Sequence, residues 1–336
     1  MREGEDVEAM LAALRERFGE RARAGELLSR HGTFGVGGPA DAWVTLNHED
    51  ELAMLVALAQ AHEWPLMLVG NGTNVLFSDA GARGIIARMA LDEWRLDDGD
   101  AAHTRLIAGA GVSLPKLVNE LARRGLTGLE WGAGVPGTIG GAVVSNAGAH
   151  GACVADTLAT ARVLFVPTRP GDDAKIRELT AHELELGYRR SRFRAPREIV
   201  FDDEGRPSAA PRAPIEPREM ITGATFQLRH ADPTEVKDRV AAYRRHRKET
   251  QPPQPSAGSV FKNPPGDHSG RLIEAAGLKG HQLGRAQISP VHANFIVNRG
   301  GATAADVVAL IALARRTVRE QFGVELELEV ELRGDW

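Results

Sequence analysis

Apolar residues recur at helical spacing in several separate stretches of the chain. Near the N-terminus, Val7, Met10, Leu11, Leu14 and Phe18 share one face of a predicted amphipathic helix. Later stretches begin at residues that cap helices, and most end at glycine or proline. The further predicted helices run from 47–50 to about residue 61, from 114 to 124, from 233 to 250 and from 304 to 322.

Short apolar runs between these helices predict strands. They lie at 40–45, 66–69, 75–77, 106–108, 162–166 and 224–228. Residues 324–332 alternate apolar side chains with glutamates and predict a final strand, with Glu325, Glu327, Glu329 and Glu331 on one face. Strands mixed with helices indicate an α+β protein.

The segment 196–217 interrupts this pattern. It contains five prolines among charged and small residues. Since proline removes a backbone donor and fixes φ, we expect an exposed loop without regular structure.

The stretch 132–151 is dense in glycine and contains no Lys, Arg, Asp or Glu. Glycine lets backbone N–H groups close around an anion, so this stretch can hold a diphosphate. A set of tight turns is the alternative. The spacing Gly132-x-Gly134-x-x-Gly137 also matches a dinucleotide fingerprint, but Pro136 lies inside it and no long helix follows, which argues against a Rossmann unit.

Composition excludes several classes of protein. The chain has 336 residues and a net charge of −4, so we do not expect a surface devoted to nucleic acid. Cys153 is the one cysteine, which excludes an internal disulfide and a cysteine-based metal cluster. The sequence shows no signal-peptide pattern, no apolar run long enough to span a membrane and no metal motif, so we expect a cytoplasmic protein without metal.

Basic residues gather at the end of the predicted helix 233–250. Arg244, Arg245, Arg247 and Lys248 lie there. They are either a solvated cluster that favours the helix dipole or a contact for substrate phosphates.

Four segments in this order resemble the UDP-N-acetylenolpyruvoylglucosamine reductase family, over roughly residues 28 to 334. The segments are 33–40, 70–77, 134–148 and 256–264. The resemblance implies an FAD-binding unit of the PCMH/VAO type with two subdomains, and a C-terminal α/β domain that binds substrate. It places a helical extension at 1–27, the FAD-binding unit at 28–230 with subdomains at 28–88 and 89–230 and an insertion at 196–217, the substrate domain at 231–323, and a returning strand at 324–336.

The resemblance implies noncovalent FAD and NADPH. The residues expected to bind the flavin are Gly35, Gly37, Gly70, Asn71, Gly72, Thr73, Asn74, Val75, Gly134, Pro136, Gly137, Thr138, Gly140, Gly141, Asn146, Ala147 and Gly148.

By the same resemblance, Arg189 stabilises the substrate carboxylate, Ser259 donates a proton and Glu329 is the catalytic glutamate. Glu327 and Glu331 stay open as alternatives to Glu329. Residues implied to contact substrate are Tyr188, Lys262 and Asn263. Since Tyr188 and Tyr243 are the only tyrosines, the chain resembles the shorter form of the family, which lacks a tyrosine-bearing loop.

The expected reaction is NADPH-dependent reduction of UDP-N-acetylglucosamine enolpyruvate to UDP-N-acetylmuramate in peptidoglycan precursor synthesis, by a monomer without nucleic-acid or membrane partners. Two alternatives remain at this point. One is an oxidase or dehydrogenase of the same flavin fold. The other is a nucleic-acid-binding module that uses the basic clusters, which the net acidity and the lack of interleaved aromatic residues disfavour.

Overall fold

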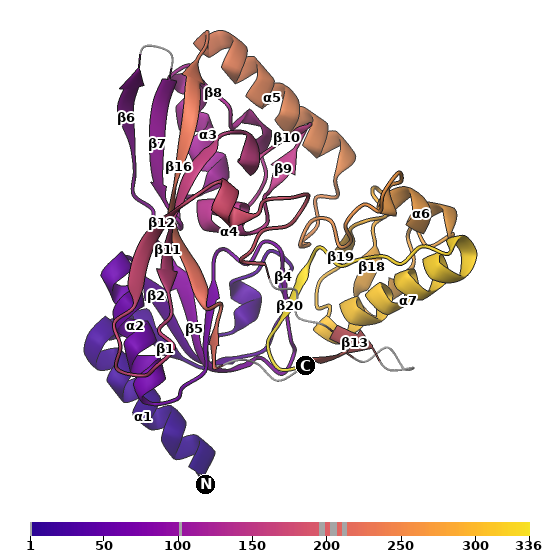
Figure 1. The fold of residues 1–336 in the computed structure, drawn as a ribbon. Helices are drawn as coiled ribbons and strands as arrows, with labels where there is room; N and C mark the ends of the chain where they lie inside the picture. Colours follow the sequence, from indigo (N-terminus) through magenta and orange to yellow (C-terminus); the bar gives the residue numbers. More distant parts are fainter. Residues whose placement is uncertain (1, 101–102, 195–198, 202–206, 210–213) are drawn as a thin grey trace.

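The computed structural model describes residues 2–100, 103–194, 199–201, 207–209 and 214–336 (Figure 1). Two sheets and a smaller C-terminal unit make up this part of the chain. Each of these three parts is built mostly from a continuous segment, so elements that follow one another in the sequence mostly belong to the same part.

The first sheet has five strands in the order β1-β2-β5-β3-β15. These are β1 (Ala22–Ala24), β2 (Ala40–Leu46), β5 (Ala82–Met89), β3 (Leu66–Val69) and β15 (Ile215–Glu216). The pairs β2–β5, β3–β5 and β15–β3 are parallel, and β1 runs antiparallel to β2. Helices α1 (Arg2–Phe18) and α2 (Glu49–Ala61) pack their apolar faces into the adjoining core, as the helical spacing predicted.

The second sheet is antiparallel and has the order β12-β11-β16-β7-β6. Its strands are β12 (Lys175–Thr180), β11 (Leu158–Phe165), β16 (Glu219–His230), β7 (His103–Gly109) and β6 (Trp94–Asp100), and β8 (Leu126–Thr127) adds to β16. Helices α3 (Leu114–Arg123), α4 (Ile139–Val144) and α5 (Pro233–Thr250) belong to this part. The predicted cap of α5 is confirmed, since the Asp232 carboxylate accepts from the backbone N–H groups of Thr234 and Glu235.

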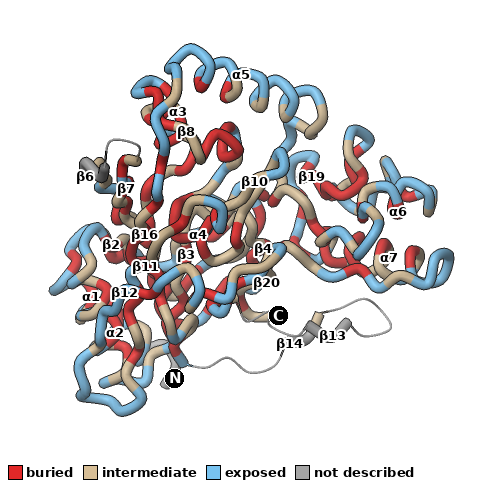
Figure 2. Tube along the Cα trace, turned by 45° about the horizontal axis from the view of Figure 1, so that its top comes forward, coloured by how far each residue is buried: buried red, intermediate tan, exposed pale blue. Residues whose placement is uncertain are grey.

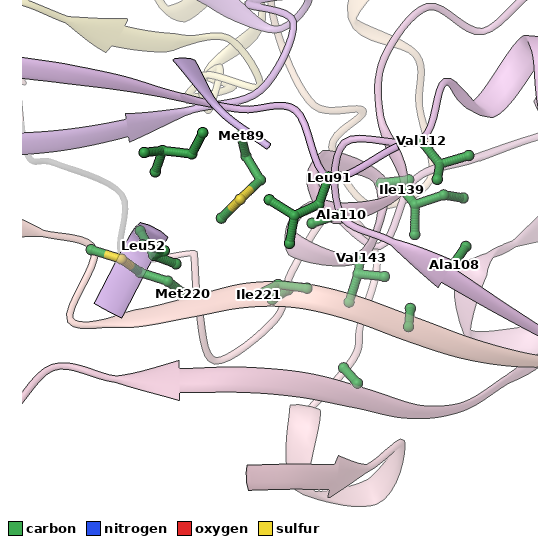
Figure 3. Packing of buried hydrophobic residues seen from close by; sticks show 14 of the residues in the cluster. Leu52, Met89, Leu91, Ala108, Ala110, Val112, Ile139, Val143, Met220 and Ile221 are labelled. Carbon is green, nitrogen blue, oxygen red and sulfur yellow. The ribbon is translucent and has the colours of Figure 1, made fainter. Parts of the chain in front are cut away.

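One hydrophobic core joins the two sheets. Leu52 of α2, Met89 of β5 and Met220 of β16 all belong to it, together with Ile139 of α4 (Figure 3). Burial is concentrated in the strands, whereas α5 exposes much of its length (Figure 2). The shared core holds the loops at the ends of both sheets in fixed relative positions.

The C-terminal unit has its own core. It contains α6 (Ser269–Ala275), α7 (Ala304–Phe322) and the three-stranded sheet β17 (Gln282–Leu283), β18 (Ala286–Ile288) and β19 (Ile296–Asn298). The chain then returns to the first part, where β20 (Glu331–Arg333) pairs in parallel with β4 (Val75–Phe77). Figure 1 shows β20 in yellow beside β4 in indigo, although they are far apart in sequence.

Two predictions about local structure are wrong. The segment 196–217 was expected to form no regular element, yet β13 (Ile199–Phe201) pairs with β14 (Pro207–Ala209), and β15 joins the first sheet with Ile215 buried. Its residues 196–198, 202–206 and 210–213 lie outside the described part. The strand expected over 324–332 begins only at Glu331, with one isolated bridge between Leu328 and Phe261 before it.

The predicted domain boundaries stay predictions. The segment 1–27 holds α1 as expected, and it also supplies β1 to the first sheet. No helix in the described part of the chain is long and apolar enough to cross a membrane.

Candidate active site

The loop 70–74 connects β3 to β4 and turns sharply at Gly72. Gly72 has a φ of +59°, and a Cβ atom there would come within 2.1 Å of the carbonyl oxygen of His31. Only glycine fits such a conformation without strain. Next to it, the Asn71 side-chain oxygen accepts a hydrogen bond from Arg88 at 3.2 Å.

A second glycine loop, 134–141, leads into α4 and touches the first. Gly134 and Gly137 have φ values of +74° and +136°. A Cβ atom on Gly137 would lie 3.2 Å from the Thr73 hydroxyl, and one on Gly70 would lie 3.0 Å from the Thr138 hydroxyl. The two loops therefore pack closely at these glycines, where an added Cβ atom would make a tighter contact than is usual.

These loops line a cavity of about 520 Å³, which is in the range of small-molecule sites. Of the residues expected to bind flavin, most lie in its wall: Gly70, Asn71, Gly72, Thr73, Asn74, Val75, Gly134, Pro136, Gly137, Thr138, Gly140, Gly141, Ala147 and Gly148. Apolar side chains from both sheets and from α3, such as Met89, Leu114 and Ile221, complete the wall.

The wall suits a dinucleotide with an apolar ring system. The glycines expose backbone rather than side chains, and no charged side chain belongs to either loop. Backbone N–H groups in such loops bind phosphate oxygens, and the apolar residues offer a surface for a flat ring. The residues present therefore fit FAD.

Three residues expected to bind flavin are not part of the described cavity wall. A Cβ atom on Gly37 would lie 2.6 Å from the Cβ of Phe77, and Gly35 lies beside the side chain of Asn298. These two glycines permit close packing of the chain against itself. Asn146 is buried, donating to the Gly187 carbonyl oxygen at 2.8 Å and accepting from the Ala155 N–H at 3.1 Å.

The three expected catalytic residues line the same cavity, although they come from distant parts of the chain. The Arg189 Nε donates to a carboxylate oxygen of Glu329 at 2.6 Å, and its Nη2 donates to the Gly148 carbonyl oxygen at 2.8 Å. The backbone N–H of Glu329 bonds the carbonyl oxygen of Val260 at 2.8 Å, which puts Glu329 beside the Ser259 loop.

The glutamates of the C-terminal segment do not share one environment. Glu329 contacts Arg189, and its side chain is 15% exposed. Glu327 is 65% exposed and pairs with Lys262 outside the cavity wall. Glu331 lines the cavity and bonds Arg333 at 2.6 Å. The expectation that all of them lie on one face is therefore wrong, because residues 324–330 do not form a regular strand.

The residues expected to contact substrate form a group of their own beside the cavity lining. The Tyr188 ring is exposed, and its hydroxyl accepts from the Asn263 N–H at 3.4 Å. The Arg189 guanidinium lies 5.5 Å from the centre of that ring. The Asn263 side chain accepts from the Ser269 N–H at 3.1 Å. None of Tyr188, Lys262 and Asn263 is among the described lining residues.

Some cavity residues were not singled out from the sequence. They include Arg194, Glu219, Gln251 and Arg333. Arg247 was noted only as part of a basic cluster, but it alone of that cluster lines the cavity, next to Gly134. Burial lowers the pKa of Arg247, and no carboxylate pairs with it among the described residues. Helical spacing separates Arg247 from Arg245 and Lys248 but puts it on one face with Arg244, whose guanidinium contacts Asn119 instead.

No group of acidic, histidine or cysteine side chains that could hold a metal ion occurs among the residues whose placement is described.

Comparison with known proteins covers both parts of the chain. A family model for the UDP-N-acetylenolpyruvoylglucosamine reductase C-terminal domain matches residues 251–333, and a model for an FAD binding domain matches residues 40–168. The UDP-N-acetylenolpyruvoylglucosamine reductase of Chloroflexus aggregans is 43% identical over 92% of this chain and 97% of that protein. The same-named protein of Bacillus subtilis is 35% identical over 98% of this chain and 99% of its own length.

A solved structure is similar over nearly the whole length. The crystal structure of UDP-N-acetylenolpyruvylglucosamine reductase (MurB) from Thermus caldophilus has 36% identity and a TM-score of 0.68, and the match covers 91% of this chain and 97% of that one.

Proposed function

Because this chain belongs to the UDP-N-acetylenolpyruvoylglucosamine reductase family and carries out that reduction in peptidoglycan precursor synthesis, we propose that Arg189, Ser259 and Glu329 are its catalytic residues. The family, the FAD-binding fold and the flavoprotein reductase activity predicted from four short motifs are confirmed. The observation that supports the residue roles is the Arg189–Glu329 ion pair in the wall of the glycine-lined cavity.

The chemistry requires charge stabilisation at a carboxylate. The enolpyruvyl group of the substrate is an alkene conjugated to a carboxylate, and reduction at its methylene carbon builds negative charge on the neighbouring carbon and the carboxylate. When bound, FAD supplies the hydride, which it has first received from NADPH. Arg189 offers this carboxylate a planar guanidinium, and Glu329 holds the guanidinium in one orientation through its bond to Nε.

Ser259 supplies the proton in this proposal. After reduction, the carbon next to the carboxylate needs a proton, and an alcohol is acidic enough for so basic a centre. Ser259 lies in the cavity wall next to Val260, whose carbonyl oxygen accepts the backbone N–H of Glu329. Glu329 therefore connects the two groups: its backbone bonds the residue after Ser259, and its carboxylate bonds Arg189.

Arg247 is proposed as a phosphate contact. Its position beside Gly134, its lack of a carboxylate partner among the described residues and its place in the cavity wall support this role. An arginine stays protonated at neutral pH although burial lowers its pKa. This favours the second of the two interpretations of the basic helix end.

The remaining proposals rest on the family. NADPH is the expected reductant, and the cytoplasm is the expected location. The shorter form of the family is supported by the two tyrosines: Tyr188 belongs to the arginine motif, and Tyr243 of α5 stacks on His150 with ring centres 4.0 Å apart. Neither tyrosine belongs to a separate loop beyond the arginine motif and α5.

Substitution of Ser259 tests the roles because the two half-reactions separate. In Ser259→Ala, reduction of the flavin by NADPH should stay nearly normal, whereas reoxidation by the enolpyruvyl substrate should slow by about 10²-fold or more, as loss of a general acid predicts. Stopped-flow absorbance of the flavin measures both steps. Ser259→Cys, which keeps a proton donor of similar size, should reoxidise faster than Ser259→Ala. Reoxidation of Ser259→Ala at the wild-type rate would assign the proton to another donor.

A further inference from the structure

Arg194 is a buried arginine that contacts both members of the Arg189–Glu329 pair through their backbones. Its Nη1 donates to the carbonyl oxygen of Arg189 at 2.9 Å, and its Nη2 donates to the carbonyl oxygen of Glu329. Its Nε lies 3.6 Å from the Glu331 carboxylate, and its side chain is only 6% exposed. We propose that Arg194 is a positioning residue that sets the geometry of this pair. The inference rests on the proposed roles of Arg189 and Glu329.

The backbone at Arg189 is in an unusual conformation that needs support. Arg189 has a φ of +52°, in the left-handed region that residues with a Cβ rarely adopt. It lies inside a tight turn closed by paired hydrogen bonds between Gly187 and Arg190. The bond from Arg194 satisfies the carbonyl oxygen of Arg189 and fixes its direction.

The backbone of Glu329 is held from two sides. Its carbonyl oxygen accepts from Arg194 and also from the Asn74 side chain at 2.8 Å. The Glu331 N–H in turn bonds the Asn74 carbonyl oxygen at 2.9 Å. Asn74 belongs to the first glycine loop, so Arg194 links the Arg189 turn to a segment that is anchored on the flavin-binding wall.

A guanidinium suits this role better than other side chains. Its donors lie in one plane at fixed spacing, so bonds to two carbonyl oxygens fix the distance between the two chain segments. Glu331 compensates the charge that burial would otherwise penalise. Arg194 also touches the cavity, so a test must separate positioning from direct contact with substrate.

Arg192, two residues before Arg194, provides a matched control. It bonds the Glu219 carboxylate at 2.6 Å and the Glu183 carbonyl oxygen at 3.3 Å, but contacts neither Arg189 nor Glu329 among the described contacts. Like Arg194, Arg192 bonds a carboxylate and a backbone carbonyl oxygen, so Arg192→Met removes a similar arginine and leaves the contacts of Arg189 and Glu329 in place.

We expect Arg194→Met to bind FAD and to be reduced by NADPH like the wild type. Reoxidation by the enolpyruvyl substrate should slow on the order of 10²-fold, the cost of misplacing a catalytic group by about 1 Å. Arg192→Met should reoxidise like the wild type. Arg194→Lys keeps the charge but not the fork, so its rate should lie between those of Arg194→Met and the wild type, and it carries the test if Arg194→Met does not fold.

Combination with Arg189→Lys distinguishes the mechanisms. If Arg194 acts through Arg189, then Arg194→Met should add little to the loss already caused by Arg189→Lys. Multiplied losses, a raised KM with unchanged kcat, or wild-type reoxidation in both Arg194 variants would overturn the inference. Wild-type turnover in Arg189→Lys would instead overturn the proposed catalytic role of Arg189.

Discussion

Gly141 offers a test of the flavin site in which one substitution has opposite effects on the empty and the loaded protein. Gly141 is the third residue of α4, lines the cavity, and has ordinary helical geometry. A Cβ atom there would meet only the Thr138 hydroxyl, at 3.6 Å, which is normal contact. Gly141→Ala therefore adds a methyl group that the protein itself tolerates.

The expected magnitudes follow from this geometry. Without flavin, replacing a helical glycine by alanine should raise the free energy of unfolding by about 0.5 to 1 kcal/mol, because the unfolded chain loses freedom. With flavin bound, the same methyl group occupies space at the cavity wall that the flavin would otherwise approach closely. Overpacking of this kind costs about 1 to 3 kcal/mol, so the Kd for FAD should rise roughly 5- to 150-fold.

The assay compares thermal unfolding of flavin-free and flavin-loaded protein, together with a fluorescence titration by FAD. Gly140→Ala is the comparison, because its Cβ would lie 2.8 Å from that of Ala110 in the core, and it should destabilise both forms. Tight FAD binding by Gly141→Ala, equal to that of the wild type, would refute the assignment of this loop to the flavin.

Three further predictions follow from single contacts. Arg189→Lys should retain flavin but lose most turnover, since an ammonium cannot reproduce the bonds to Glu329 and Gly148; steady-state rates and the flavin spectrum measure this. Arg247→Met should weaken binding of the UDP-bearing substrate and make that binding less dependent on salt, which titration of substrate at several ionic strengths measures. Hydrogen bonds from Arg21 are the main cause that lowers the pKa of Glu51 to about 2, so ionised Glu51 should stabilise the fold at any pH above its pKa in the unfolded chain. Glu51→Gln should therefore lower the free energy of unfolding by about 2 kcal/mol at pH 7, measured by urea unfolding. The difference from the wild type should vanish as the pH falls toward 2.

Local sequence predicted the helices well because their signals are local. Asp232 caps α5, and Thr303 and Gly323 bound α7 as expected, with Gly323 in the left-handed conformation at a φ of +68°. Caps and apolar spacing act within one turn of helix, so they are readable without knowledge of the fold.

The C-terminal segment shows what a local pattern cannot give. Alternation of apolar and acidic residues over 324–332 reports which side chains are buried, and Leu326, Val330 and Leu332 are indeed buried. Strand pairing requires a neighbour along the whole length, and β4 offers one only to residues 331–333. The environment of each glutamate therefore depends on distant partners.

The glycine signal has a similar limit. Glycine marks a place where something approaches the backbone closely, but the sequence does not say whether that is a ligand or another part of the chain. At Gly72 the carbonyl oxygen of His31 approaches the backbone, and at Gly37 the side chain of Phe77 does, yet of these two glycines Gly72 alone is among the described lining residues. The four motifs predicted the family correctly, whereas Gly35, Gly37 and Asn146, which lie outside the described cavity lining, stay predicted flavin contacts.

Charge within the cavity differs from charge over the whole chain. The chain carries a net charge of −4, which disfavoured nucleic acid as a partner. Among the described residues that line the cavity, four arginines face three glutamates, an excess of one positive charge; they are Arg189, Arg194, Arg247 and Arg333 against Glu219, Glu329 and Glu331. Glu329 and Glu331 pair with Arg189, Arg194 and Arg333 of the same wall, so among the described lining residues Arg247 is the arginine without a carboxylate partner. A ligand with a diphosphate and a carboxylate matches this wall, because its negative charges meet arginines and glycine N–H groups there, although the whole chain carries a net negative charge.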